Sequence, residues 1–501
     1  MVASARALAL RPLRGGGRMT TPPRCGAEPL RVVLWLRADL RTHDNAVFEH
    51  ARTLPHACVL PVYVAHDAPC RLLASTPRTG AHRARFLAAA LADLRARLRR
   101  AGSGLAVLHG APEEVIAALR PHLVVTQSEP CAEERGAEAR LAAALRTTGA
   151  ALHALPMDTV FAREGLPFAA DLHDMPNSGV TFLKRALAAG CAPAAPHAGV
   201  LDGVPQLGSA WEALPALDAS TPFGAAADGE PRGETAALAA LDALLWQSDT
   251  VRRYAATRNE LRGGTGLSAH LALGCVSVRT VAAALDRYDL ARPGAEHATG
   301  WAPGGLRFEL GVRDYFRFAA RRWGSALFAE QGPVPRDPPH SWSSDAAAMD
   351  AWRAGMTGVP LVDAIQRQLA AEGHVSNRAR QITASWAVLA RGLDWRCCAE
   401  HFEAMLRDYD PSSNAGNWLA VAGLSGGREN WFNVALQAAK YDASGEYVRQ
   451  YVPELARLPD EAIHAPWMLS AQALADAGVV LGRTYPKAEL ATLRAPPPRG
   501  R

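Results

Sequence analysis

Residues 373–423 read GHVSNRARQITASWAVLARGLDWRCCAEHFEAMLRDYDPSSNAGNWLAVAG, and this stretch decides the fold of the second half of the chain. Ile382 and Trp386 recur at helical spacing, which predicts amphipathic helices. Two aspartates, Asp408 and Asp410, then stand one residue apart in front of a polar loop rich in turn-forming residues. Buried carboxylates are costly unless they are paired or hydrogen-bonded. The stretch therefore predicts a helical domain that carries a polar binding site.

The two aspartates, Asp408 and Asp410, admit three interpretations. We expect them at the end of a helix, where the helix dipole disfavours negative charge, so a cation such as Arg378 or Arg380 has to compensate. They can bind a metal through a D-x-D pattern, although no His or Glu accompanies them at ligand spacing. They can instead cap a loop, or accept hydrogen bonds from a planar ligand whose face packs near Trp418.

The length, charge, apolar stretches and cysteines of the chain limit the class of protein. Its 501 residues exceed one ordinary core, so two or more domains are expected. The net charge of +5 suits an anionic partner without requiring one. No stretch is long and apolar enough to cross a bilayer, so no membrane partner is expected. The eight cysteines are scattered without a C-x-x-C pair, which favours a reducing compartment over a disulfide framework.

Residues 30–156 alternate between strand and helix patterns. Five apolar runs of strand length are LRVVLWL, CVLPVYVA, LAVLHG, HLVVTQ and ALHALP. Helical patterns such as AHRARFLAAALADLRARLRRAG separate several of them, which predicts an α/β domain with a parallel, Rossmann-like sheet. Asp44 or Asn45 is expected to cap the helix after the first strand. Neither G-x-G-x-x-G nor G-x-x-x-x-G-K-[ST] occurs, so the two simplest nucleotide-binding fingerprints are absent.

Changes in composition divide the chain into segments. Residues 1–29 are rich in Arg and poor in acids, which is typical of an organelle transit peptide, with a leader of no function as the alternative. Residues 30–160 form the predicted α/β domain, residues 161–232 a linker with much Ala, Pro and Gly, and residues 233–460 a nearly all-α domain. Residues 461–501 are predicted to be a C-terminal tail, since they end in APPPRGR.

The stretch at 373–423 resembles the flavin-binding core of the cryptochrome/photolyase family. The family's N-terminal signature, R-x-D-L-R-x-x-D-N, is matched by Arg37, Asp39, Leu40, Arg41, Asp44 and Asn45. GETAALAALDALLW, LALGCVSVRT, RDYFRF and GEYVRQYVPELARLP also match, in the expected order from about residue 30 to 460. FELGVRDYFRF, SNRARQ, SNAGNW and GGRENWFN, with Gln381 and Asn417, are most similar to the cryptochrome-DASH branch. The resemblance implies a large all-α C-terminal domain that binds FAD.

The resemblance also implies which residues surround the flavin ring. Asp408 and Asp410 match positions that face the ring edge, and Arg380 matches the arginine that pairs with the first of them. Asn414 matches the residue beside flavin N5, where a neutral amide can hydrogen-bond without adding charge.

The phosphate-binding segment of the family corresponds to Tyr254, Thr265, Leu267 and Ser268, with a contribution from Arg313. The sequence RGGTGLSAH departs here from the usual Ser/Thr-rich pattern, since Gly264 and Gly266 stand where side chains are usual. Backbone N–H groups at a helix start can still hold phosphate.

Three tryptophans, Trp418, Trp395 and Trp342, match positions that in the family pass electrons from the protein surface to the photoexcited flavin. The alternative is that they are core residues, and that alternative applies equally to Trp352 and Trp386.

The N-terminal domain is implied to hold an antenna chromophore, methenyltetrahydrofolate. SEPCAEE occupies the matching region, so Glu129 and Glu133 are candidate ligands. Either residue can instead be a solvated charge on a helix.

In the family's repair reaction, reduced FAD excited by blue light gives an electron to a cyclobutane pyrimidine dimer, and the electron returns after the ring opens. The lesion has to be flipped out or single-stranded to reach a buried flavin. Positions that meet the lesion or its phosphates correspond to Glu309, Asn377, Arg378 and Gln381.

Two departures weigh against efficient repair. Val312 and Ala420 stand where the family has large aromatics that line the pocket and contact the dimer. Base–aromatic stacking contributes about 1–3 kcal/mol per base, and neighbours such as Trp431 can replace it only in part. The sequence therefore favours a blue-light photoreceptor of cryptochrome-DASH type with nucleic-acid affinity. Photolyase activity on single-stranded DNA is the close alternative, and a D-x-D metal-dependent transferase is kept as a control hypothesis.

Single-stranded DNA is the expected partner, with RNA and duplex DNA as alternatives. The chain is expected to be a monomer, and the sequence indicates no particular protein partner. The N-terminal composition predicts a chloroplast or mitochondrial location, with the nucleus left open.

Overall fold

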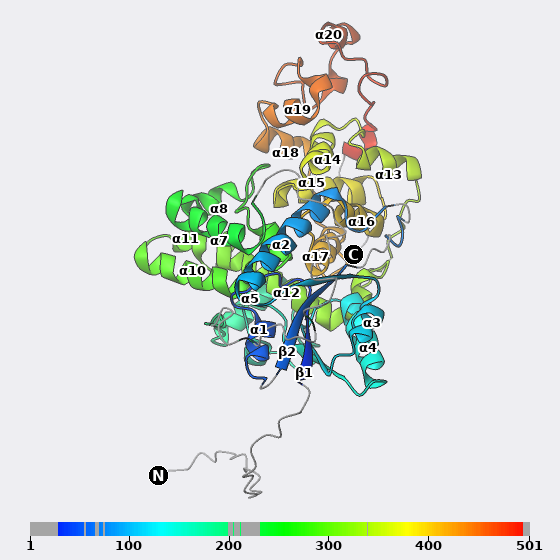
Figure 1. The fold of residues 1–501 in the computed structure, drawn as a ribbon. Coiled ribbons are helices and arrows are strands. Elements are labelled where there is room, and N and C mark those ends of the chain that lie inside the picture. Colours follow the sequence, from blue (N-terminus) through cyan, green and yellow to red (C-terminus); the bar gives the residue numbers. More distant parts are fainter. Residues whose placement is uncertain are drawn as a thin grey trace, which may run out of the picture.

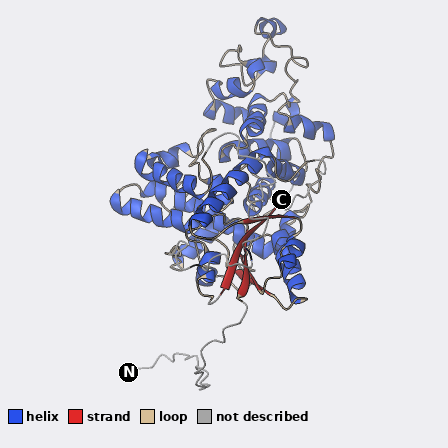
Figure 2. Cartoon of the chain, viewed as in Figure 1, coloured by secondary structure: helices blue, strands red, loops and turns tan. Residues whose placement is uncertain are grey.

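The computed structural model describes residues 29–493, apart from 55–56, 66–69, 74–75, 199–203, 205–210, 212–230 and 338. The expected transit peptide falls almost wholly on residues 1–28, which lie outside the described residues, as do residues 494–501. Strands occur only in the first third of the described chain, and helices make up most of the rest (Figure 2). The predicted pairing of an α/β domain with a helical domain is confirmed.

A five-stranded parallel sheet lies at the centre of the α/β domain. Its strands are β1 (Leu30–Leu36), β2 (Ala57–Ala65), β3 (Ala106–His109), β4 (Leu123–Gln127) and β5 (Ala151–Leu155). They are ordered β3-β2-β1-β4-β5, and each falls on an apolar run predicted from the sequence. Along β1, Val32 and Leu34 pack into one apolar cluster and Val33 and Trp35 into another. Both faces of the sheet are therefore covered, which explains why the strand is apolar throughout instead of alternating.

Helices connect these strands: α1 (Ala46–Ala51), α2 (Ala81–Arg100), α3 (Pro112–Val115) and α4 (Ala132–Arg146) (Figure 1). Asn45 caps α1, because its side chain accepts hydrogen bonds from the backbone N–H groups of Val47 and Phe48. Asp44, the other predicted cap, has a left-handed φ of +43° and turns its carboxylate away from the helix.

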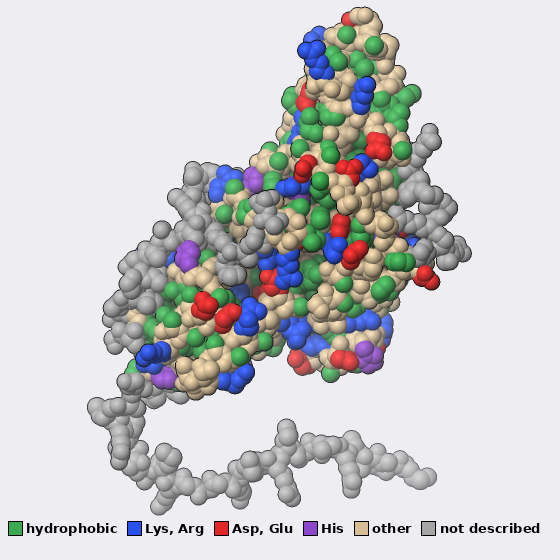
Figure 3. All heavy atoms as spheres, turned by 90° about the vertical axis from the view of Figure 1, so that its right-hand side faces the viewer, with side chains coloured by type: hydrophobic (Ala, Val, Ile, Leu, Met, Phe, Trp, Pro, Cys, Tyr) green, Lys and Arg blue, Asp and Glu red, His purple; other side chains and the backbone are tan. Residues whose placement is uncertain are grey.

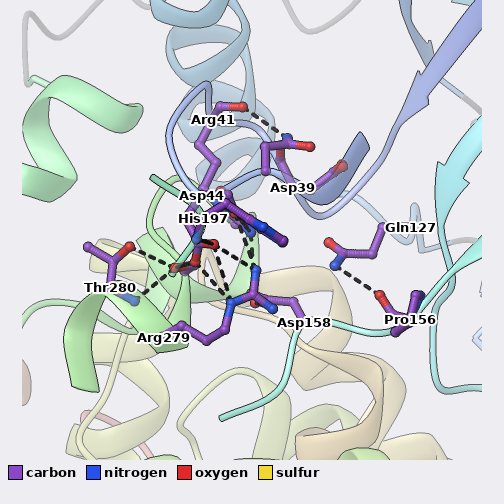
Figure 4. Close-up of polar contacts among 12 residues, drawn as sticks. Asp39, Arg41, Asp44, Gln127, Pro156, Asp158, His197, Arg279 and Thr280 are labelled. Carbon is purple, nitrogen blue, oxygen red and sulfur yellow. Dashed lines mark hydrogen bonds and ion pairs between the residues drawn. The ribbon is translucent and has the colours of Figure 1, made fainter. Parts of the chain in front are cut away.

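Asp44 instead joins the two domains. Its carboxylate accepts hydrogen bonds from the backbone N–H of His197 at 2.7 Å, from Nη2 of Arg279 at 2.9 Å and from the hydroxyl of Ser277 (Figure 4). Arg41 from the same signature donates to the carbonyl of Gly274 at 3.0 Å. The N-terminal signature is thus a buried polar joint between the first strand and the helical domain.

The segment predicted as a linker, residues 161–232, is partly structured. It contains α5 (Gly179–Ala188), whose Phe182 and Leu183 are buried. Leu183 packs where a side chain at Gly311 would lie, so this helix is held close against the helical domain. Residues 161–198 therefore cover the core instead of spanning solvent.

The helical domain begins at Glu234, and its helices divide between two apolar clusters. Its helices are α7 (Glu234–Asp242), α8 (Tyr254–Thr257), α9 (Ser268–Ala272), α10 (Val278–Ala291), α11 (Glu296–Thr299), α12 (Leu306–Trp323), α13 (Ala346–Arg353), α14 (Pro360–Glu372), α15 (Asn377–Ser385), α16 (Trp395–Met405), α17 (Pro411–Ala422), α18 (Val434–Tyr441), α19 (Glu446–Tyr451) and α20 (Ala471–Asp476). The long helices α10 and α12 pack mainly into the cluster shared with the sheet, whereas α14 to α17 form a second core. Helices α7, α8, α10 and α11 form one group beside the α/β domain, whereas α18 to α20 lie at the opposite end of the molecule from the sheet (Figure 1).

Residues 461–493, predicted as part of a tail, pack against the helical domain. Tyr485 is buried and its hydroxyl lies 2.6 Å from Oδ2 of Asp363 on α14. The indole of Trp386 also donates to the hydroxyl of Thr492 at 3.3 Å. Among the described residues, no helix is both long enough and apolar enough to span a membrane.

Candidate functional site

A cavity that is partly open to solvent lies among α15, α16 and α17. Seven of the predicted site residues line it: Asn377, Arg380, Gln381, Asp408, Asp410, Asn414 and Trp418. The helices that supply these residues follow one another in the sequence, and they also meet in space, since α15 and α16 both pack against α17. The polar site predicted from the sequence is therefore a real concavity with charged, amide and aromatic walls.

Asp408 is a buried carboxylate held by the side chains of Arg380 and His374. Nη2 of Arg380 donates to both of its oxygens, at 2.7 and 2.9 Å, and Nδ1 of His374 lies 3.4 Å away. Burial alone would raise the pKa of Asp408, but Arg380 and His374 outweigh it and hold that pKa well below its usual range. Asp408 is thus a permanent negative charge in the cavity wall.

Asp410 differs from the expectation that it ends a helix. It is the N-cap of α17, and its Oδ1 accepts from the backbone N–H of Ser413 at 2.7 Å and from the hydroxyl of Ser412 at 2.6 Å. A helix N-terminus favours negative charge, so the dipole supports this carboxylate instead of opposing it. Nη1 of Arg317 lies 3.4 Å from its Oδ2. Burial raises its pKa, yet Arg317 and Arg313 lower that pKa further, so Asp410 is also ionised.

Asn414 lies one turn into α17. Its amide nitrogen donates to the carbonyl of Ala399 at 3.1 Å, and its amide oxygen accepts from the indole N–H of Trp418 at 3.1 Å. These two bonds fix the amide in the cavity wall while leaving one N–H and one lone pair for a ligand.

The three predicted electron-transfer tryptophans fall into an inner and an outer part. Trp418 is buried, with its ring centroid 5.2 Å from that of Phe402 and 6.3 Å from that of Trp352. Trp395 and Trp342 both donate to the carbonyl of Glu330, at 3.0 and 3.3 Å, so these two indoles meet at one backbone oxygen. Trp395 is buried and Trp342 is half-buried, which leads from the cavity towards solvent.

The predicted phosphate-binding segment lies beside the cavity and not in its wall. In the part of the chain that the structure describes, the cavity lining includes none of the following residues: Tyr254, Thr265, Leu267 and Ser268. Thr265 accepts from the backbone N–H of Leu267 at 3.3 Å just before α9. Asn259 links the segment to α15, because its side chain accepts from Nη2 of Arg378 at 3.1 Å.

Glu309 lies close to Tyr254 of the predicted phosphate-binding segment. Its Oε1 is 2.6 Å from Nη1 of Arg258, and burial together with the Glu309 charge raises the pKa of Tyr254. Arg378 packs over the rings of Phe432 and Tyr441, at 5.1 and 5.5 Å from their centroids. Of the four residues predicted to meet a lesion, Asn377 and Gln381 line the cavity. Arg378 lies next to it, against the lining residue Phe432, and Glu309 pairs with Arg258 outside the lining.

Val312 and Ala420, the two small residues in place of aromatics, have different surroundings. Ala420 lines the cavity. Val312 is half-buried and packs near the start of α5, where a side chain at Gly179 would lie 3.5 Å from its Cγ2. Only Ala420 therefore shortens the cavity wall in this structure.

A second cavity lies between α4 of the α/β domain and α16 of the helical domain. Glu133, Glu134, Trp395 and Asn414 are among its lining residues, so its floor meets the wall of the first cavity. Glu133 lines it and pairs with Arg78 and, at 3.3 Å, with Arg71. Glu134 was not singled out in the sequence, and burial raises its pKa to about 7.

Glu129 does not line the second cavity. It is buried at the joint between the domains, where its Oε2 accepts from Nη2 of Arg317 at 3.1 Å. Of the two residues predicted as antenna ligands, Glu133 thus lines the second cavity, whereas Glu129 lies at the joint between the domains.

Two important partners of the aspartates, His374 and Arg317, were not found by sequence reasoning. His374 follows the helix-ending Gly373 and lies beside Asp408 because the backbone N–H of Arg407 donates to the carbonyl of Gly373 at 2.9 Å, which joins the two segments. Arg317 lies four residues after Arg313 on α12, and that helical spacing was a signal for a shared buried face. The described residues contain no group of His, Cys, Asp and Glu arranged to hold a metal. Both aspartates are instead engaged by arginine, which does not suit a cation site.

Comparison with known proteins identifies the class to which this fold and site belong. The family described as DNA photolyase matches residues 32–197, and the family described as FAD binding domain of DNA photolyase matches residues 306–494. A crystal structure of a Synechocystis cryptochrome is 32% identical with a TM-score of 0.79, covering 93% of this chain and 98% of that one. A class III photolyase from Agrobacterium tumefaciens is 28% identical with a TM-score of 0.72, covering 95% of this chain and 98% of that one.

Curated relatives narrow the class. Cryptochrome DASH from Danio rerio is 37% identical over 476 residues, covering 91% of this chain and 89% of the relative. A protein from Ostreococcus tauri named cryptochrome DASH, chloroplastic/mitochondrial, is 37% identical over 87% of this chain and 86% of the relative. The chain belongs to the cryptochrome/photolyase family, in its cryptochrome-DASH branch, and it carries that family's FAD-binding domain.

Proposed function

We propose that this chain is an FAD-dependent blue-light photoreceptor of cryptochrome-DASH type with affinity for DNA. The observation that carries the proposal is one cavity wall in which Asp408 with Arg380, Asp410, Asn414 and Trp418 lie together. FAD supplies absorption of blue light and the exchange of electrons. The remaining steps concern what the side chains of this chain do.

The residues of the cavity fit a flavin by their chemistry. The ionised carboxylates of Asp408 and Asp410 are acceptors for the N–H groups of a planar ring, while Arg380 and Arg317 offset their charge. Phe402 and Leu406 add apolar surface for the faces of that ring. The free N–H and lone pair of Asn414 offer a neutral contact at the ring edge.

Trp418, Trp395 and Trp342 are proposed to deliver electrons to this cavity from outside. Trp418 lines the cavity, and the other two indoles are tied to the carbonyl of Glu330 on the way to solvent. Burial of the inner pair keeps water away from them, and partial exposure of Trp342 lets an external donor replace the lost electron.

Ala420 favours photoreception over repair as the function of this chain. It lines the cavity with a methyl group where an aromatic surface would contact a dimer. Each stacked base is worth about 1–3 kcal/mol, so the cavity lacks a substantial part of the lesion affinity. The charged wall around Asp408 is not affected by this loss.

Light-driven repair of cyclobutane pyrimidine dimers in single-stranded DNA is the second candidate. The observation in its favour is that Asn377 and Gln381 share the cavity with the flavin-edge residues. A flipped-out base in the cavity would therefore meet two amide side chains able to read its edge.

DNA affinity is proposed to be local to the cavity margin. On the face seen in Figure 3, the described Lys and Arg side chains are interspersed with Asp and Glu, so this face offers no broad basic surface for phosphates. Arg378, stacked over Phe432 and Tyr441, and the nearby Lys440 are the proposed phosphate contacts. A monomer acting on single-stranded DNA is the simplest arrangement.

The second cavity is the proposed site of a methenyltetrahydrofolate antenna. Glu133 and Glu134 present acceptors there, and Phe328 and Leu72 provide apolar surface for a fused ring. The cavity borders Asn414 and Trp395, which suits the transfer of excitation towards the first cavity. Location in a plastid or mitochondrion is proposed from the Arg-rich N-terminus, and because an algal and a plant relative are named chloroplastic/mitochondrial.

Two experiments test the proposal. Fluorescence titration of the purified protein should give saturable FAD binding, and absence of binding would contradict both leading functions. Illumination of the FAD-loaded, reduced protein with dimer-containing single-stranded oligonucleotide then separates them. Repaired thymines formed no faster than in a flavin-only control support photoreception, whereas faster repair places the photolyase function first.

A further inference from the structure

Glu129 is connected to the first cavity through a single guanidinium. Its Oε2 accepts from Nη2 of Arg317 at 3.1 Å, and Nη1 of the same arginine lies 3.4 Å from Oδ2 of Asp410. Glu129 follows β4 of the α/β domain, Arg317 belongs to α12, and Asp410 lines the cavity as the cap of α17. Three elements from both domains are thus joined by one chain of ion pairs.

The position of Glu129 is itself fixed by the N-terminal signature. Its backbone N–H donates to Oε1 of Glu138 at 3.1 Å, and that oxygen lies 2.6 Å from Nη2 of Arg37. Arg37 also donates to the carbonyl of Gln127 at 2.5 Å, at the end of β4. The carboxylate of Glu129 is therefore presented to Arg317 by a preformed turn and does not depend on a ligand.

Arg317 is shared between two negative charges. It is only 3% exposed, and its Nε has no hydrogen-bond partner, so the contacts to Glu129 and Asp410 account for its bonding. Charges at this separation interact strongly when water is excluded. Because Arg317 divides its charge between two carboxylates, Asp410 is less completely neutralised than it would be in a simple pair.

We infer that Glu129 is a positioning residue for Asp410, and that through Arg317 it sets the electrostatic potential at the cavity edge. The inference rests on the proposed function, in which a flavin lies at that edge. Reduction of a bound flavin adds negative charge to the cavity, and the carboxylates of Asp410 and Glu129 oppose that addition. Removing the charge of Glu129 takes one negative charge away from the cavity edge. It also leaves Asp410 as the one remaining partner of the pair of carboxylates on Arg317, so that Asp410 is more completely neutralised. Both effects make the cavity more favourable to negative charge.

The variant Glu129→Gln tests this inference, because it keeps the shape of the side chain and removes its charge. Anaerobic redox titration of the FAD-loaded protein should give a midpoint potential more positive than that of the unaltered protein. Glu113→Gln is the matched control, since Glu113 lies in the same domain but pairs with the exposed Arg140 at 2.5 Å. The control should keep the unaltered potential. A residue that only ties two domains together would change stability without moving the potential in this direction.

Glu129→Asp keeps the charge on a shorter side chain. Its midpoint potential should lie between those of the unaltered protein and of Glu129→Gln. The inference is overturned if FAD is bound and the Glu129→Gln potential is unchanged or more negative. If the glutamine variant does not fold, the aspartate variant carries the test alone, and a potential equal to that of the unaltered protein overturns the inference. Failure of the unaltered protein to bind FAD would instead contradict the proposed function, so the two failures are distinguishable.

Discussion

The two cavities hold buried acids in opposite ways. In the first, Asp408 and Asp410 are buried beside Arg380 and Arg317, and their pKa values are lowered. In the second, burial raises the pKa of Glu134 to about 7, and one of its oxygens has no hydrogen-bond partner. The same chemical group is therefore a fixed charge in one place and a titrating group in the other.

Asp408→Asn should have the largest effect, because it removes the charge for which Arg380 and His374 are placed. Losing a charged acceptor for a buried N–H of the ligand costs about 1.5–3 kcal/mol, so the dissociation constant for FAD should rise by about 10- to 150-fold. Fluorescence titration measures it. Asp350→Asn, which alters an exposed pair with Arg353, is the control. Equal FAD affinity in both variants would mean that Asp408 is not part of the binding wall.

Trp418→Phe should remove most of the rate of flavin photoreduction, measured on protein that has been saturated with FAD. The inner tryptophan lies in the cavity wall and is the first donor of the proposed series. Time-resolved absorption after a blue flash measures the rate, with Trp467→Phe, at the far end of the helical domain, as the control. An unaltered rate in Trp418→Phe would return Trp418 to the role of a core residue.

Ala420→Trp should sharpen the difference between photoreception and repair. A new aromatic face in the cavity adds stacking worth about 1–3 kcal/mol per base, equivalent to about 5- to 150-fold tighter binding of a dimer-containing oligonucleotide. Fluorescence anisotropy measures the affinity, and Ala435→Trp on the exposed face of α18 controls for non-specific stacking. If Ala420→Trp binds no more tightly than the control, the small residue is not what limits lesion binding.

Glu134→Gln should have the smallest effect, a change in how the free energy of unfolding depends on pH. A carboxyl whose pKa is raised from 4.5 to about 7 binds its proton more tightly in the folded state, so the stability it adds is present below pH 4.5 and is lost as the pH rises through 7. From pH 8 to pH 6 the free energy of unfolding should therefore rise, by on the order of 1 kcal/mol more than in Glu134→Gln. Denaturant titrations at the two pH values measure it, and identical slopes in both proteins would show that Glu134 has an ordinary pKa.

The sheet was predictable because its strands are buried on both faces, which makes each a short apolar run such as LRVVLWL. The helix from Pro411 to Ala422 was not predictable from the sequence, since Ser, Asn and Gly have poor helix propensity and favour a loop. Tertiary packing overrides that preference: Gly416 lets the ring of Phe316 lie directly against α17. The sequence pointed to Arg380 as a partner of Asp408, but the sharing of Arg317 between Glu129 and Asp410 depends on contacts between residues far apart in the chain.

The most direct test is the absorption spectrum of the FAD-loaded protein before and after blue light under anaerobic conditions. A buried flavin held by Asp408 and Asp410 and supplied with electrons through Trp418 should give a structured flavin band that bleaches under blue light and recovers in air. A protein that stays colourless after reconstitution with FAD, or whose flavin band does not respond to blue light, would contradict this function.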